Sequence, residues 1–199
     1  ATQAPLAAAR FGLERLRRGL QHALPDTGAR RAQLQSQAAR LTTMFASQFS
    51  DCRHRHATLQ AQIASDICLD ESIRSAADAR AAIGLGSCRI VNIKQGRVGG
   101  IPEAVRVHDA ARAAGIPVWC GGMLETGVGR ATNLALAAMP GFTLPGDTSA
   151  SHRYFMEDIT EPFVLAPDGT MGVPDGPGIG VDPIPERLLE TTVHAEHVS

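Results

Sequence analysis

The chain has 199 residues, of which 44% are hydrophobic, and this is enough for one globular domain with a core of its own. The formal net charge of -1 excludes the basic field with which many proteins bind nucleic acid or anionic membranes, so we expect neither partner. The sequence shows no apolar run that could cross a bilayer and no signal-peptide pattern, and its four cysteines form no CxxC pair. We therefore expect a reduced, cytoplasmic protein without a structural zinc site.

The first part of the chain differs in composition from the rest. Residues 1–55 are rich in Ala, Arg and Gln and contain no strand-like run, and stretches such as Ala29–Leu41 favour a helix by propensity. We predict an atypical helical or disordered region over residues 1–55, and a separate α/β unit over residues 56–199.

From about residue 63, short β-rich runs alternate with helical stretches. The predicted elements, in chain order, are strand Ile67–Leu69, helix Ser75–Ile83, strand Arg89–Ile93, helix Pro102–Ala114, strand Ile116–Cys120 and helix Thr126–Met139. A loop-rich stretch follows from Pro145. Alternation with short connections is typical of a parallel sheet or a β/α barrel. A complete barrel usually needs about 250 residues, so we predict part of one.

A charged side chain follows each of the three predicted strands. Asp70, Lys94 and Glu125 come at or just after the strand ends. In a β/α barrel the carboxyl ends of the strands form the face that carries the active site, so we expect these three groups to share one cavity. The alternative is three ordinary loop charges, which the repeated position after a strand disfavours.

Long motifs surround these residues. They are CLDESI at Cys68–Ile73, NIKQGRVGG at Asn92–Gly100, VWCGGMLETG at Val118–Gly127, LPGD at Leu144–Asp147 and GPGIGV at Gly176–Val181. Together they resemble the o-succinylbenzoate synthase / N-acylamino acid racemase family of the enolase superfamily. The resemblance runs nearly without gaps from about His56 to about Leu189. It implies the C-terminal part of an enolase-type barrel.

The resemblance implies a magnesium-dependent enzyme that abstracts a proton next to a carboxylate and passes through an enediolate. The implied reaction is either the dehydration that gives o-succinylbenzoate in menaquinone biosynthesis or the racemisation of N-acylamino acids. Both share the enediolate, so the sequence does not choose between them. The implied substrate is a small-molecule carboxylate. Carboxylate oxygens are the ligand type that magnesium prefers, and cations stabilise the charge of an enediolate.

The resemblance also implies roles for single residues. Asp70 is the implied magnesium ligand, and Lys94 is the implied acid/base or enediolate-stabilising lysine. The implied substrate-binding residues are Gly122, Met123 and Glu125, and the implied supporting residues are Glu71, Asn92 and Asp147. A homo-oligomer is one assembly that we consider.

The sequence departs from the family by lacking its other motifs. The Lys-x-Lys pair of the second strand, the Asp-x-Asn segment of the third and the Glu-Gln-Pro segment of the fourth do not occur, and Lys94 is the only lysine. The family's N-terminal capping domain is not recognisable either. We therefore predict negligible activity for the isolated chain. A non-catalytic remnant and a small carboxylate-binding half-barrel are the alternatives.

A shifted reading frame would explain the Ala-, Arg- and Gln-rich composition of residues 13–50, and we state this as a hypothesis. When Arg18–Pro25 is back-translated and shifted by one base, the degenerate code permits Val-Asp-Ser-Asn-Thr, which resembles the family's third-strand ligand segment. The shift does not recover the fourth-strand glutamate. The nucleotide sequence across residues 1–60 and upstream, read in all three frames, tests the hypothesis. We expect Asp-x-Asn in a neighbouring frame, and a sequence that cannot encode it there would refute the idea.

Overall fold

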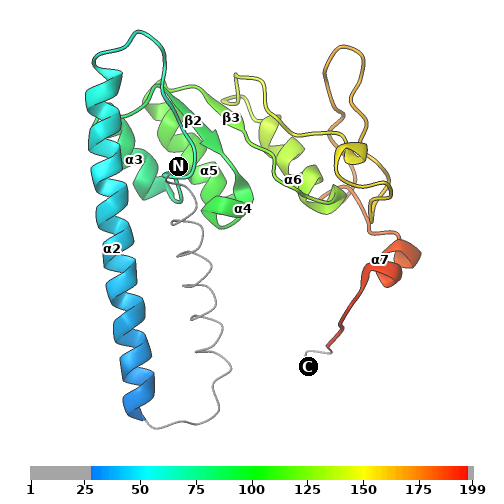
Figure 1. The fold of residues 1–199 in the computed structure, drawn as a ribbon. Helices are drawn as coiled ribbons and strands as arrows, with labels where there is room; N and C mark the ends of the chain where they lie inside the picture. The colour runs from blue at the N-terminus through cyan, green and yellow to red at the C-terminus, as the bar shows by residue number, and fades with distance from the viewer. Residues whose placement is uncertain (1–27, 197–199) are drawn as a thin grey trace. The chain divides into compact units, whose positions relative to one another are not determined.

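A computed structural model describes residues 28–196 of the chain (Figure 1). The chain divides into two compact units, Ala1–Cys52 and Arg53–Ser199. The described part of the first unit is the beginning of helix α2 (Gly28–Gln60). This helix contains the helical stretch predicted at Ala29–Leu41 and is longer, because no Pro and no further Gly interrupts the run of helix-forming residues. The remainder of the predicted atypical region, residues 1–27, lies outside the described residues.

The second unit is built on a three-stranded parallel sheet. Its strands are β1 (Cys68–Leu69), β2 (Ile90–Ile93) and β3 (Val118–Cys120), in the order β1-β2-β3. Cys68 pairs with Ile90, and Val91 pairs with Val118. Each strand falls within a predicted one. The parallel pairing of β1 with β2 and of β2 with β3 confirms the predicted parallel sheet.

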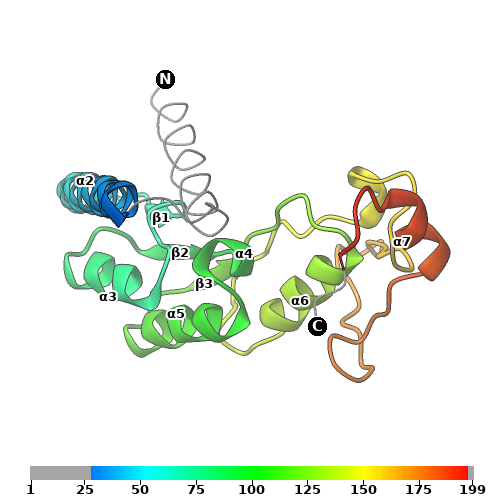
Figure 2. The ribbon, with the colours of Figure 1, turned by 90° about the horizontal axis from the view of Figure 1, so that it is seen from below.

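Helices follow each strand, as the alternation indicated. They are α3 (Ala76–Gly84), α4 (Gln95–Val98), α5 (Ile101–Ala113) and α6 (Gly127–Ala137). Figure 2 shows α3 and α5 next to each other beside the strands. Helix α4, a single turn directly after Lys94, was not predicted from the sequence.

Local sequence signals set the ends of these helices. The Ser75 hydroxyl accepts a hydrogen bond from the Asp78 backbone N–H at 3.2 Å and caps α3. Pro102 occupies the first turn of α5, where a missing N–H costs nothing. Gly115, with a φ of 70°, ends the turn after α5 in a conformation that few other residues adopt.

The core of the second unit lies between the sheet and the helices. Small side chains on α3 and α5 allow the two helices to approach each other and the sheet closely. The fully covered members of this core include Ala79, Ala82, Val91, Ile93, Ala104, Val107, Ala111 and Val118. A second, smaller cluster joins Ala131 and Leu134 of α6 to Phe163.

The C-terminal stretch is mostly loop, as predicted, with two short helical pieces. These are a 3-10 turn, η1 (Ser151–Arg153), and α7 (Pro185–Thr191). Neither was predicted, because each is too short to give a periodic apolar pattern. Over residues 28–196, no helix is long and apolar enough to cross a membrane.

Candidate active site

The carboxyl ends of the three strands carry the candidate site. Asp70 follows β1 directly, Lys94 follows β2 as the N-cap residue of α4, and the loop Gly121–Thr126 follows β3. Since the strands are parallel and adjacent, these three points lie along one edge of the sheet. The short connections leave each polar group close to its strand.

Asp70 lies between two cationic side chains. The Lys94 ammonium donates to Asp70 Oδ2 at 2.9 Å, and the Arg97 guanidinium donates to Asp70 Oδ1. The side chains of Asp70, Lys94 and Arg97 are 27%, 18% and 5% exposed. We call these three residues the Asp70 ion cluster. Because it is largely shielded from water, its charge-assisted hydrogen bonds hold the lysine in one place.

Arg97 ties the cluster to the backbone. Its Nε donates to the Ile73 carbonyl oxygen at 2.8 Å, and its terminal nitrogen donates to the Asn92 carbonyl oxygen. It thereby joins the turn after β1 to the end of β2. Arg97 falls within one of the family motifs, but no role was predicted for it from the sequence. The available signal was its position three residues after Lys94, but without α4 nothing indicates that its side chain turns back to Asp70.

Asn92 and Gly121 lie against Lys94. Asn92 is 1% exposed, and neither polar atom of its amide has a hydrogen-bond partner among the described residues. A Cβ on Gly121 would collide with the Asn92 amide and come within 2.7 Å of Lys94 Cε. A glycine is therefore needed at the end of β3 to leave room for the two side chains of β2.

The loop after β3 is held by two carboxylates. The Gly122 backbone N–H donates to Asp147 Oδ1. The Met123 N–H donates to Glu125 Oε2 at 2.7 Å, while Glu125 Oε1 accepts from the Asn133 amide at 2.9 Å. The structure thus brings together the four predicted residues Gly122, Met123, Glu125 and Asp147. Glu71, by contrast, is exposed and takes no part in the contacts of the Asp70 ion cluster.

The model of the family called enolase C-terminal domain-like matches residues 47–187. The chain belongs to this family. It is 65% identical over 137 residues to an N-succinylamino acid racemase of Amycolatopsis sp., a match that covers 69% of this chain and 37% of the relative. It is 60% identical over 135 residues to an o-succinylbenzoate synthase of Geobacillus stearothermophilus, covering 68% of this chain and 36% of that one. The chain thus spans little more than a third of the curated relatives that it matches.

Solved structures agree with this assignment. A member of the enolase superfamily from Enterococcus faecalis V583 has a TM-score of 0.65 at 52% identity, covering 68% of this chain and 37% of the other. Muconate lactonizing enzyme from Pseudomonas putida has a TM-score of 0.65 at 26% identity, covering 71% and 39%. These matches confirm the predicted partial barrel of the enolase C-terminal type and the family resemblance given by the motifs.

Magnesium, which the resemblance implies, does not fit the described residues of this enolase-type chain by themselves. Within residues 28–196, no group of three His, Cys, Asp or Glu side chains could hold a metal ion. Asp70 offers one carboxylate, and both of its oxygens already accept hydrogen bonds from cationic side chains. A divalent cation at that position would lie beside two positive charges with a single anionic ligand, which by itself is a poor site for magnesium.

Two thiols near the sheet have pKa values raised by burial. Burial raises the pKa of the Cys120 thiol to about 12, and burial also raises the pKa of Cys68 above its ordinary value. The thiolate is the reactive form of cysteine, so a raised pKa disfavours nucleophilic chemistry at both groups. Cys68 instead accepts a hydrogen bond from the Trp119 indole at 3.2 Å.

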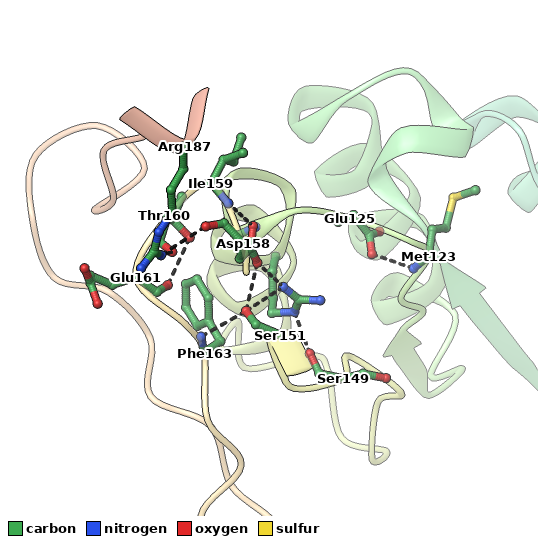
Figure 3. A network of polar contacts seen from close by, with 12 residues as sticks. Met123, Glu125, Ser149, Ser151, Asp158, Ile159, Thr160, Glu161, Phe163 and Arg187 are labelled. Atoms are coloured by element: carbon green, nitrogen blue, oxygen red, sulfur yellow. Dashed lines mark hydrogen bonds and ion pairs between the residues drawn. The ribbon is translucent and has the colours of Figure 1, made fainter. Parts of the chain in front are cut away.

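A buried polar network fixes the beginning of α6 (Figure 3). Arg130 and Asp158 form an ion pair at 3.1 Å with both side chains 1% exposed, and Ser151 donates to the same Asp158 oxygen at 2.8 Å. The other Asp158 oxygen accepts from the Gly127 backbone N–H at 2.9 Å. This network was not predicted from the sequence, because its members lie far apart in the chain and nothing local marks Asp158 as buried.

The contact of Gly121 with Asn92 and Lys94 gives a stability prediction. We expect Gly121→Ala to lower the free energy of unfolding by about 1–3 kcal/mol, because a methyl group would be forced into two packed side chains. Urea unfolding followed by circular dichroism measures the change.

Gly96→Ala is the matched control. A Cβ at Gly96 meets no atom within 4 Å and the residue is helical, so we expect no loss and a gain of up to about 1 kcal/mol. Equal effects of the two substitutions would contradict the close packing at Gly121.

Proposed function

We propose that this chain supplies the proton-transfer lysine and one substrate-binding loop of an enzyme that abstracts a proton next to a carboxylate. The observation that carries the proposal is the Lys94–Asp70 pair, with its 2.9 Å contact at the carboxyl edge of a parallel sheet. Its relatives' names, N-succinylamino acid racemase and o-succinylbenzoate synthase, support the same chemistry. A small-molecule carboxylate is the proposed substrate.

Lys94 Nζ is the atom at which the proton is held. As the free amine it would take the proton from the carbon next to the substrate carboxylate, and the electron pair left behind would move into that carboxylate as an enediolate. The ammonium so formed keeps Asp70 as its partner, which orients Nζ and stabilises its charge. The positive charges of Lys94 and Arg97 also favour the negative charge of the enediolate.

The loop after β3 is proposed to border the rest of the substrate. Met123 and Leu124 are 51% and 74% exposed, which is high for large apolar side chains, and they are available to contact an apolar part of a ligand. Gly122 and Met123 form the proposed substrate edge, and Asn92 and Asp147 stay as proposed supporting residues. Four further assignments remain predictions: Asp70 as a magnesium ligand, Glu71 as a supporting residue, the cytoplasmic location and a homo-oligomer.

The two candidate reactions differ in what they require of the lysine. Racemisation needs a proton donor and an acceptor on opposite faces of the carbon, whereas dehydration can proceed from one face. This chain contains one lysine, so it supplies a lysine base on one face of the substrate carbon alone. Either reaction is therefore proposed for a barrel that includes the part of the relatives that this chain does not span.

A grafting experiment tests the proposal. Residues 56–189 replace the matching segment of the Amycolatopsis N-succinylamino acid racemase, and proton NMR in D2O follows exchange of the α-proton separately for the L and the D enantiomer of an N-succinylamino acid. We expect the graft to exchange both, and Lys94→Ala to lower the rate on the order of 10²–10⁴-fold for the enantiomer whose α-proton faces Lys94. The isolated 199-residue chain is expected to show no exchange above background.

Arg112→Ala is the control, because it removes a cation from an exposed position of α5. It should leave the exchange rate of the graft unchanged. A folded but inactive graft, or a Lys94→Ala graft with full activity, would overturn the proposal. Saturable carboxylate binding by the isolated chain without any exchange would instead favour the half-barrel binding protein.

A further inference from the structure

Both oxygens of the Glu125 carboxylate accept hydrogen bonds from other groups of the chain. Figure 3 shows it directed at the backbone of Met123, whose N–H donates to Glu125 Oε2 at 2.7 Å. The other oxygen accepts from the Asn133 amide at 2.9 Å. Hydrogen bonds to a carboxylate are stronger than neutral ones, so these two contacts resist displacement by a ligand.

Helix α6 is shaped to receive this side chain. A Cβ on Gly129 would lie 2.8 Å from both Cβ and Cγ of Glu125, so the glycine opens the path along which Glu125 runs over the helix. Asn133, one helical turn further on, is fully buried and presents its amide at the end of that path. The Glu125 side chain thus passes over Gly129 and reaches Asn133 along α6.

The helix is itself a fixed platform. Its first backbone N–H, that of Gly127, donates to the buried Asp158, and Arg130 pairs with the same carboxylate. Gly127 has no room for a side chain, because a Cβ there would collide with Thr160. A contact that attaches the loop to α6 therefore attaches it to a well-packed part of the unit.

We propose that Glu125 is a positioning residue: it clamps the Met123 backbone N–H to Asn133 and thereby sets where the loop Gly121–Thr126 presents Met123 and Leu124. This inference rests on the proposed function insofar as that loop borders the substrate. Glu125 then influences which apolar group the site accepts without touching the substrate. It differs from the direct substrate contact that the family resemblance implied for this residue.

The clamp is tested on the 199-residue chain by amide hydrogen exchange and 15N NMR of Met123. Glu125→Ala removes both acceptors, and Asn133→Asp places two carboxylates against each other. We expect each to speed exchange of the Met123 amide by about tenfold or more, the effect of losing a hydrogen bond to a charged acceptor. Glu161→Ala, which removes an exposed carboxylate, is the control and should have no effect.

Two conservative variants separate the clamp from general destabilisation. Glu125→Gln keeps an acceptor for Met123 and can pair with Asn133 after its amide turns over, so Met123 should stay protected. Combining Glu125→Gln with Asn133→Asp should restore the protection that Asn133→Asp alone loses, because the Gln amide donates to the new carboxylate. Unchanged Met123 exchange in Glu125→Ala, or no rescue by the double variant, would overturn the proposal. If Glu125→Ala does not fold, the Asn133→Asp and double-variant pair decides.

Activity of the graft distinguishes positioning from direct contact. A positioning role predicts that Glu125→Gln keeps kcat/KM within about threefold, while Glu125→Ala loses about tenfold or more. A Glu125→Gln graft that loses as much as Glu125→Ala while Met123 remains protected would show direct substrate contact and overturn the clamp. An inactive parent graft would count against the proposed function alone, since the exchange data do not depend on it.

Discussion

The ion cluster of Asp70, Lys94 and Arg97 is the interaction on which the candidate site depends. One carboxylate at the end of β1 holds the ammonium at the end of β2 at 2.9 Å, and Arg97 locks the opposite oxygen. An isolated ion pair on the surface contributes little to the free energy of folding. Here Arg97 is 5% exposed and also binds two backbone carbonyls, so the cluster fixes a lysine between two strands rather than merely pairing charges.

The surrounding structure gives this cluster its geometry and space. Parallel pairing of β1, β2 and β3 brings the strand ends together, and Gly121 leaves room for Asn92 and Lys94. On the other side of the loop, α6 is held by Asp158 and Arg130, and Glu125 connects the loop to it. Reactive and supporting groups thus follow the strands, while buried polar contacts behind them keep the loop in place.

The sequence predicted the elements and the strand-end residues because both follow local patterns. Apolar runs with Gly and Pro boundaries identified β1, β2, β3 and their helices to within a few residues, and the motifs indicated the family before any fold was known. Arg97, the Glu125 clamp and the Arg130–Asp158 pair could not be predicted, because each depends on side-chain direction or on contacts between distant segments. The one-turn helix α4 shows the same limit, since four residues carry no periodicity.

Acetylation of Lys94 is the most direct measurement of the central claim. Lys94 is the only lysine, so mass spectrometry of the peptide that contains it separates its modification by acetic anhydride from modification of the N-terminal amine. If Asp70 holds the ammonium, Asp70→Asn should speed acetylation by about tenfold, the effect of losing a charge-assisted hydrogen bond. Asp66→Asn, which breaks the exposed pair with Arg89, should leave the rate unchanged. Equal rates in the parent chain and Asp70→Asn would contradict the account, because Lys94 would then not be held by Asp70 in solution.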